Sequence, residues 1–215
     1  MSMRSKAFTL IELALVIATL ALLVLVVILG LAANKGKSLR LKCCDNLKQV
    51  GLSYRTWTMD SSDRYPQAVE VRYGGSKELL EAGQLSRHFT TMSNELSTPK
   101  VLVCPADREK EPAESFQWGF SITNISYFAS QDAAEQYPQT ILSGDRNLAL
   151  AGKSVSSGML VLTTNSLLPL SWTKTVHDSK GLFGLADGSV QLIDQQKLPA
   201  IVQNQDLETN RLVMP

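Results

Sequence analysis

The first 33 residues contain a long apolar segment with one charged side chain at its start. Residues 13–33 consist almost entirely of Ala, Leu, Val and Ile, and Glu12 directly precedes them. About 20 consecutive apolar residues are enough for a helix to cross the hydrocarbon core of a bilayer. The pattern therefore predicts a membrane-spanning helix with a carboxylate at its entrance, either in the hydrocarbon or at headgroup level. A carboxylate at that depth is costly unless it is paired, so Glu12 is a candidate functional residue.

From Leu39 onward the apolar positions follow a helical period. They recur at steps of three and four residues, which places them on one face of a helix: Cys43, Leu47, Val50, Tyr54 and Trp57. Polar residues and Gly36 precede this stripe, and a glycine costs only about 1 kcal/mol in a helix, so the helix either breaks there or continues. We expect continuation, with an amphipathic half over residues 34–60 that ends in turn-forming residues at 60–66.

The rest of the chain, residues 61–215, has the pattern of short strands separated by turns. Strands are predicted at 101–104, 125–128, 141–143 and 159–163, and Asp187-Gly188 between two apolar runs predicts a hairpin over 183–193. Short helices are expected at 77–83 and 197–202, with a loop at 94–99 and a polar tail after 202. Together these patterns predict an α+β protein in which a long N-terminal helix packs on a mostly antiparallel sheet.

Composition narrows the classes of function. The chain has 215 residues and a formal net charge of +1, without a long block of like charge. The residues after the apolar segment are enough for one domain with its own core. Nucleic-acid binding is not expected, because the basic residues at 35–42 lie beside a predicted membrane span. Basic residues occur on both sides of that span, so charge alone does not give its orientation.

The three cysteines differ in their position on the predicted elements. Cys43 lies on the apolar stripe, whereas Cys44 is rotated by about 100° toward the polar face. Cys104 ends the predicted strand at 101–104, so Cys43 is its better partner if the domain is exported. A Cys43–Cys104 disulfide is therefore expected, and two buried free thiols are the alternative. No Cys-x-x-Cys pair or histidine-rich spacing predicts a zinc site.

The N-terminal residues carry a resemblance to a known family. The run from Phe8 to Leu13, after a short basic leader, resembles the processing signal of type IV pilins and type II secretion pseudopilins. The resemblance implies a leader of residues 1–7, cleavage by a prepilin peptidase between Ala7 and Phe8, and methylation of Phe8. It also implies that Glu12, at the fifth mature position, pairs with the amino terminus of a neighbouring subunit. Where the family usually has Gly before the cut, this chain has Ala7.

Later motifs extend the resemblance over most of the chain. The Cys43-x-x-Asn46 pattern followed by Leu-Lys-Gln-Val-Gly-Leu, together with Tyr65-Pro66 and Val-Cys-Pro-Ala-Asp at 103–107, is similar to a branch of bacterial pilin-like proteins with a C-terminal H-X9-DG motif. Here that motif is His177, nine residues, then Asp187 and Gly188. The resemblance implies a pilin-like fold with a membrane and assembly helix at 8–33, its amphipathic continuation at 34–60, and a head domain at 61–215.

The function implied by this resemblance is structural. The chain would be a single-pass protein of the bacterial inner membrane with its head in the periplasm, or outside the cell in a filament. It would assemble with other pilin-like subunits into a type II secretion pseudopilus or a type IV pilus-like filament, with a prepilin peptidase, an assembly platform and an ATPase as partners. The alternative is a membrane-anchored extracytoplasmic binding module that does not polymerise. A secretory signal peptide cut after Ala32 and an uncleaved anchor are further readings of the apolar segment.

Two polar residues of the H-X9-DG motif have the residue types of a catalytic pair. His177 and Asp187 are followed by Ser179 and Ser189 as candidate nucleophiles, but no Gly-x-Ser-x-Gly elbow accompanies them. A structural hydrogen bond between His177 and Asp187 across the hairpin is the expected role. No enzymatic activity is predicted.

A calcium site is the remaining chemical candidate. Major pseudopilins of type II secretion bind calcium in a C-terminal loop, so the resemblance makes Asp145 and Asn147 candidate ligands. Calcium takes six to eight oxygen ligands, so Asp178 and Asp187 would have to add theirs. A plain turn without a cofactor is the expectation here.

Overall fold

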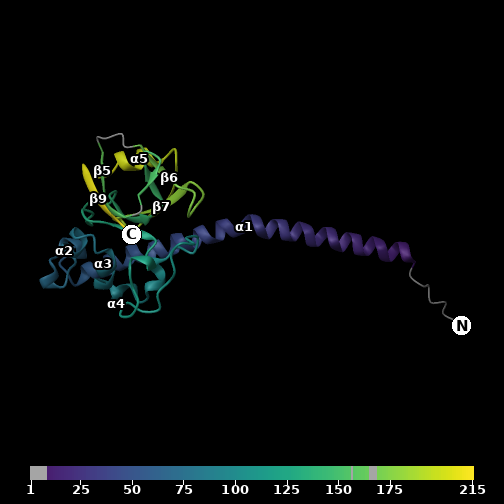
Figure 1. The fold of residues 1–215 in the computed structure, drawn as a ribbon, viewed down its shortest axis with the longest axis horizontal. Helices are drawn as coiled ribbons and strands as arrows, with labels where there is room; N and C mark the ends of the chain where they lie inside the picture. The colour runs from purple at the N-terminus through teal and green to yellow at the C-terminus, as the bar shows by residue number, and fades with distance from the viewer. Residues whose placement is uncertain (1–8, 156, 165–168) are drawn as a thin grey trace. The chain divides into compact units, whose positions relative to one another are not determined.

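The computed structural model describes residues 9–155, 157–164 and 169–215, with the backbone alone for residues 29–35. The chain divides into two compact units, residues 1–38 and 39–215. The long helix α1 (Leu10–Met59) belongs to the first unit over its N-terminal part and to the second unit from Leu39 onward (Figure 1).

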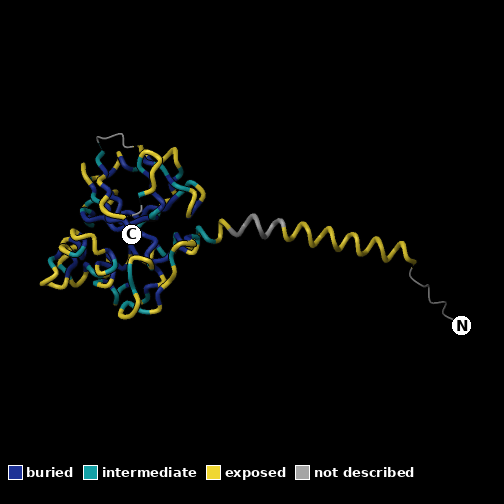
Figure 2. The backbone as a smooth tube through the Cα atoms, viewed as in Figure 1, coloured by how far each residue is buried: buried dark blue, intermediate teal, exposed yellow. Residues whose placement is uncertain are grey.

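In the first unit, residues 10–28 of α1 form a segment with a mean hydropathy of 3.0. Side chains are exposed along the whole of this segment (Figure 2). A helix of this length and composition can cross a membrane. The prediction of an N-terminal apolar helix is therefore confirmed, and so is its continuation through the polar residues at 34–38.

From Leu39 to Met59, α1 is part of the core of the second unit. The apolar stripe of the helix is buried, with the following residues at its centre: Cys43, Leu47, Val50 and Tyr54. The amphipathic prediction is confirmed, because the intervening polar positions such as Lys48 remain exposed. After Met59, Ser62 and Asp63 both adopt positive φ angles, and this left-handed backbone ends the helix.

Two antiparallel sheets form in the C-terminal part of the second unit, from residue 127 onward. Among the described residues, the larger sheet has six strands in the order β5-β9-β1-β2-β7-β8, and the smaller one has the order β4-β3-β6. The strands are β1 (Tyr127–Ser130), β2 (Ile141–Asp145), β3 (Leu148–Leu150), β4 (Lys153–Ser154), β5 (Gly158–Thr163), β6 (Leu170–Trp172), β7 (Lys180–Leu185), β8 (Val190–Asp194) and β9 (Thr209–Met214).

The larger sheet separates two apolar cores. Successive side chains of a strand point to opposite faces, so Tyr127 and Ala129 face the core that contains α1, whereas Phe128 faces the other core. Helix α5 (Leu198–Gln203) and the smaller sheet contribute to that second core. This two-sided burial explains why β1 and β2 are buried at nearly every position.

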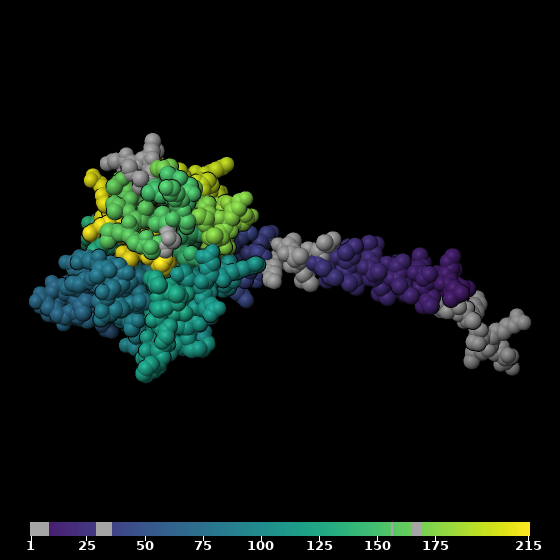
Figure 3. All heavy atoms as spheres, viewed as in Figure 1, coloured from purple at the N-terminus to yellow at the C-terminus, as the bar shows by residue number. Residues whose placement is uncertain are grey.

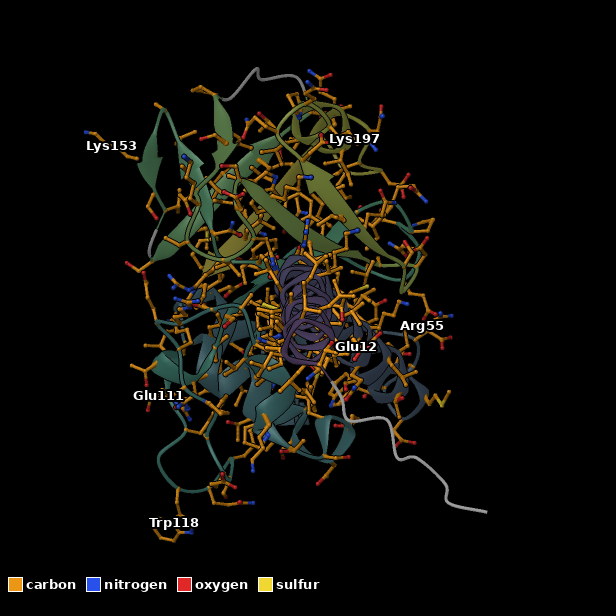
Figure 4. All side chains as sticks on the ribbon, turned by 90° about the vertical axis from the view of Figure 1, so that its right-hand side faces the viewer. Glu12, Arg55, Glu111, Trp118, Lys153 and Lys197 are labelled. Carbon is orange, nitrogen blue, oxygen red and sulfur yellow. A yellow bond between two sulfur atoms is a disulfide. The ribbon has the colours of Figure 1, made fainter. Side chains whose placement is uncertain are left out.

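Short helices occupy the segment between α1 and β1. They are η1 (Pro66–Ala68), η2 (Val71–Tyr73), α2 (Lys77–Glu81), α3 (Leu85–Thr91), α4 (Ser93–Leu96), η3 (Pro99–Leu102) and η4 (Ile122–Asn124). Leu80, Leu85 and Phe89 from α2 and α3 complete the core around α1. In Figure 3 these blue and teal residues lie directly against the green and yellow residues of the sheets. Trp118, in the loop before η4, is 85% exposed and points away from the head (Figure 4).

Several predicted elements are confirmed. The hairpin around Asp187 is formed by β7 and β8, which pair in antiparallel register. Strands β1, β2 and β5 and helices α2 and α5 occur where the pattern placed them, within two residues at each boundary. The prediction of an α+β fold with a mostly antiparallel sheet is correct.

Three predictions about local structure are wrong. The segment at 101–104 is not a strand: Pro99 and the Thr98 side chain, which accepts the Lys100 N–H, start a 3-10 helix that runs into it. The expected loop at 94–99 begins inside α4. The expected polar tail contains β9, which pairs with both β5 and β1 because its last residues, Leu212, Val213 and Met214, are apolar and buried.

Candidate functional site

The first turn of α1 is closed by a reciprocal cap between Thr9 and Glu12. The Thr9 N–H and hydroxyl both donate to Glu12 Oε2 at 2.9 Å, and the Glu12 N–H donates to Thr9 Oγ1 at 3.3 Å. This is a capping box, and its Thr-x-x-Glu signature is visible in the sequence. Glu12 therefore has a hydrogen-bonding role within its own chain. The predicted cleavage and methylation residues, Ala7 and Phe8, lie outside the described residues.

In the second unit, the predicted disulfide is present between Cys43 on α1 and Cys104 after η3. The Cα atoms are 4.9 Å apart, and 61 positions separate the two residues in sequence. Two hydrogen bonds flank the bridge: Asn46 Nδ2 donates to the Val103 carbonyl at 2.9 Å, and the Tyr127 hydroxyl donates to the Cys43 carbonyl at 3.4 Å. Since Cys43 and Asn46 lie three residues apart on one face of α1, the Cys-x-x-Asn pattern fastens the helix to the Cys104 segment twice.

His177 lies beside this disulfide and not beside Asp187. Its Nε2 atom is 3.4 Å from Cys104 Sγ and 3.4 Å from Asp145 Oδ2. The expected hydrogen bond between His177 and Asp187 is therefore wrong, because strand β7 separates the two residues along the sheet. The carboxylate partner comes from the end of the neighbouring strand β2.

Burial governs the charge of this His–Asp pair. Asp145 is fully buried, which raises the pKa of its carboxyl group to about 8, even though the Leu182 N–H donates to Oδ2 at 2.7 Å and opposes that rise. Burial likewise lowers the pKa of His177 to about 4. At neutral pH the imidazole is therefore uncharged and the carboxyl group keeps a proton, because a low-dielectric environment disfavours both charged forms.

The Asp187–Gly188 turn contacts the other end of the buried part of α1. Arg55 Nη1 donates to the Asp187 carbonyl at 3.2 Å, and the Tyr65 hydroxyl donates to the Ala186 carbonyl at 2.9 Å. Gly188 has a φ of 84°, and the Asp187 carboxylate accepts the Ser189 N–H at 2.8 Å. This local bonding is the turn role expected for Asp187.

The backbone of this turn lies close to α1 at Gly51. A Cβ atom at Gly51 would lie 3.8 Å from the Gly188 Cα atom. The H-X9-DG motif thus contacts α1 at two places: His177 at the Cys43 end, and Gly188 at Gly51, two helical turns further along. Between these two places β7 passes over Leu47, whose Cγ atom lies 3.4 Å from the position of a Cβ atom at Gly184.

The two calcium candidates are both buried. Asn147 Nδ2 donates to the Thr173 and Lys180 carbonyls at 3.2 and 2.9 Å, so its side chain supports neighbouring backbone. Asp145 Oδ1 and Asn147 Oδ1 have no hydrogen-bond partner among the described residues. These contacts describe two interior side chains in place of an open loop, and a calcium site stays the alternative to the expected turn.

A buried ion pair escaped the sequence analysis. Arg146 Nε and Nη2 donate to the two oxygens of Asp107 at 2.7 and 2.9 Å, and Ser126 donates to the same carboxylate at 2.9 Å. Burial by itself raises the pKa of Asp107, but the bonds from Arg146 outweigh it and hold that pKa below its usual value. No local spacing indicates this pair, because 39 positions separate the two residues.

The second histidine, His88, was also missed. It is fully buried, with Nε2 2.6 Å from the Tyr54 hydroxyl and Nδ1 2.7 Å from the Ser76 hydroxyl. Burial lowers the pKa of His88 to about 3, so the ring is neutral. Its position three residues before the end of α3 has no sequence signal for a partner on α1.

The first unit therefore has an apolar helix whose start is capped by Glu12. The second unit, described by itself, has a disulfide, a neutral pair of His177 and Asp145, and a turn at Gly188 that lies against Gly51. No protein-family model matches the chain, and comparisons with curated proteins and with solved structures yield no match either.

Proposed function

We propose that this chain is a structural subunit of a filament of the type IV pilus or type II secretion pseudopilus kind. In this proposal it resides in the bacterial inner membrane, is cut between Ala7 and Phe8, and then assembles through its apolar helix. The observation that carries the proposal is the fully exposed apolar surface of residues 10–28, whose one charged side chain is Glu12 near its start.

The physical chemistry of this segment suits burial among copies of itself. A helix that is apolar on all sides is stable in lipid or within a bundle of similar helices, and not in water. A carboxylate and an ammonium group each cost several kcal/mol in such surroundings and cost much less as a pair. After cleavage, the amino group of Phe8 would supply the ammonium, and Glu12 of a neighbouring subunit would exchange its Thr9 cap for that partner.

The head contributes a rigid attachment to the helix. The disulfide at Cys43, the Asn46 bond and the contact between Gly51 and Gly188 all join the helix to the rest of the second unit. A subunit that transmits force along a filament needs this kind of attachment. We expect the platform, the ATPase and the prepilin peptidase to act on the N-terminal part, not on the head.

The test is mass spectrometry of the N-terminal peptide from native membranes, in cells with and without a prepilin peptidase. We expect a peptide that begins at N-methylated Phe8, and only when the peptidase is present. An intact start at Met1 or Ser2 in both strains would make the chain an anchored, non-polymerising module. A start at Ala33 would mean secretion, and the filament proposal would be wrong.

Assembly itself is tested with Glu12→Gln, which keeps the size of the side chain and removes its charge. We expect normal processing at Phe8 but loss of the ladder of cross-linked subunits that the wild-type chain forms in membranes. Lys48→Gln, an exposed change on the same helix, is the matched control and should leave the ladder intact. A ladder that survives Glu12→Gln would contradict the pairing role of the carboxylate.

A further inference from the structure

Three side chains with metal-binding donor atoms lie together in the core of the second unit, and a fourth, Asp145, contacts one of them, His177. Cys43 comes from α1, Cys104 from the segment after η3, Asp145 from the end of β2, and His177 from the loop before β7. The two sulfur atoms and a ring nitrogen of His177 all lie within 4.8 Å of one another. His177 Nε2 is 3.4 Å from both Cys104 Sγ and Asp145 Oδ2.

We propose that the reduced head binds a zinc-type divalent cation through these four side chains, so that the disulfide and the metal are alternative closures of the same site. The inference does not depend on filament assembly, because every ligand lies in the second unit.

The separations between donor atoms fit tetrahedral coordination. Zinc bonds of about 2.3 Å to sulfur and about 2.0–2.1 Å to nitrogen or oxygen place sulfur and nitrogen about 3.5 Å apart, and nitrogen and oxygen about 3.3 Å apart. The distances from His177 Nε2 to Cys104 Sγ and to Asp145 Oδ2 are both 3.4 Å. The two sulfur atoms have to separate, as they do when the bond between them is reduced, and the Asp145 carboxylate has to move toward them.

The surroundings of the site would hold the ligands in place without the disulfide. The Leu182 N–H orients Asp145, and the Asn46 amide keeps the Cys104 segment against α1 through the Val103 carbonyl. Such hydrogen bonds to ligands and their neighbours raise metal affinity. All four ligands are buried, and the positive charge of Arg40 acts on His177. A dication with two thiolates and one carboxylate carries one excess negative charge, which Arg40 would offset.

The chemistry balances with a dithiol as reductant. The dithiol gives two electrons to the Cys43–Cys104 bond and becomes a disulfide itself, and each protein sulfur takes up a proton as a thiol. On metal binding three protons leave to solvent, two from the thiols and one from the Asp145 carboxyl group, so that Asp145 binds as a carboxylate. His177 binds as a neutral imidazole through Nε2. Loss of the metal and oxidation by a disulfide restore the bridge.

The experiment uses the full chain in detergent, reduced with a phosphine under nitrogen and titrated with Co²⁺ as the probe. We expect one Co²⁺ per chain, with sulfur-to-cobalt charge-transfer absorption and the strong visible bands of tetrahedral cobalt, both lost when Zn²⁺ is added. The oxidised chain should give neither signal. His177→Ala should weaken binding by at least about tenfold and shift the visible bands, whereas Cys44→Ser, the matched cysteine control, should change nothing.

Two further measurements keep the proposal falsifiable if reduction loosens the head. Near-ultraviolet circular dichroism and the melting temperature should both rise when Zn²⁺ is added to the reduced wild-type chain, and not when it is added to the oxidised chain. Asp145→Asn, which retains an acceptor for Leu182, should weaken Co²⁺ binding while the oxidised protein stays folded. Absence of cobalt absorption, equal affinity in His177→Ala, loss of binding in Cys44→Ser, or a reduced chain that stays unfolded with Zn²⁺ would each overturn the proposal.

Discussion

Single residues in the head are held by contacts that local sequence does not specify. The His88 ring is fully buried, and its two nitrogen atoms form hydrogen bonds with the hydroxyls of Tyr54 and Ser76, one as donor and the other as acceptor. A buried polar ring is stable only when both nitrogen atoms have partners, so these two hydroxyls are required for it to be there. The same enclosure makes the ring sensitive to pH.

We expect the head to lose stability as the pH falls below about 6.5, the usual pKa of an unfolded histidine. In the folded state the pKa of His88 is lowered to about 3, so between these values only the unfolded chain takes up the proton. The free energy of unfolding should therefore fall by up to about 1.4 kcal/mol per pH unit for this residue. Above pH 6.5 both states are neutral, and His88 adds no pH dependence.

The measurement is urea unfolding of the full chain in detergent between pH 7 and pH 5. The chain has two histidines, and the pKa of His177 is lowered in the same direction, so both histidines contribute to the slope. The raised pKa of Asp145 contributes with the opposite sign, because in this range the folded carboxyl group holds a proton that the unfolded one has lost. His88→Gln should reduce the slope by about one proton per chain relative to the wild type. An unchanged slope in that variant would show that His88 titrates normally in the folded head.

Gly51 is a second residue whose neighbours lie far away in sequence. Gly51→Ala places a Cβ in ordinary contact with Gly188, 3.8 Å from its Cα, and removes a helix-weakening glycine, so we expect stability to be unchanged or to rise by up to about 1 kcal/mol. Gly51→Leu drives a larger side chain into the turn and should cost about 1–3 kcal/mol. Denaturant midpoints measure both, with Lys48→Leu on the exposed face as control. Equal midpoints for Gly51→Leu and Lys48→Leu would contradict the close approach of turn and helix.

At the scale of elements, the second unit is organised by the contacts that α1 makes with β7 and with the segment around Cys104. Cys43 and Asn46 lie near the start of the buried part of the helix, and Gly51 and Arg55 lie further along it. Strand β7 lies between these two groups, with His177 before it in the chain and Gly188 after it. The H-X9-DG motif therefore brackets the strand that packs on this part of α1.

The disulfide between two of these elements should be worth about 3–4 kcal/mol, because it closes a loop of 61 positions in the unfolded chain. We expect the double variant Cys43→Ser, Cys104→Ser to lower the free energy of unfolding by that amount. Cys44→Ser should change it by less than about 0.5 kcal/mol, since Cys44 is a half-exposed free thiol. Non-reducing peptide maps verify the pairing, and denaturant curves give the energies. Equal losses in both variants would mean that the cysteines are interchangeable.

At the scale of the whole molecule, the two units differ in the surroundings in which they are stable: lipid or other apolar helices for the first, and water for the second. Residues 10–28 expose apolar side chains along their whole length, whereas the second unit encloses two apolar cores of its own. The last strand, β9, pairs on both edges inside the larger sheet, so the C-terminal residues are part of that fold. The second unit therefore has apolar cores of its own, formed without residues 10–28.

We expect residues 39–215, expressed in an oxidising compartment, to fold without the N-terminal unit. The fragment should be monomeric and soluble without detergent, show near-ultraviolet circular dichroism, and unfold in one cooperative transition. The full chain should need detergent or lipid because of its apolar helix. A fragment that aggregates or lacks fixed aromatic signals would show that the first unit stabilises the head.

Sequence alone was enough for features that depend on local periodicity. The apolar helix, the buried stripe of α1, the hairpin at Asp187 and the choice of Cys43 over Cys44 follow from which side chains share a face. The Thr9–Glu12 cap has a sequence signal of the same local kind, the Thr-x-x-Glu spacing. The backbone holds residues within one helix or hairpin at fixed spacing, so the sequence pattern predicts which side chains share a face.

Partner choice across elements was decided only by the tertiary structure. The pairing of His177 with Asp145, the Asp107–Arg146 ion pair and the place of β9 between β5 and β1 all depend on strand order. Strand order results from many weak contacts summed over two cores, and no short stretch of sequence contains that sum. The donor atoms around the disulfide belong to the same class, because four distant segments meet there only after the sheet has formed on α1.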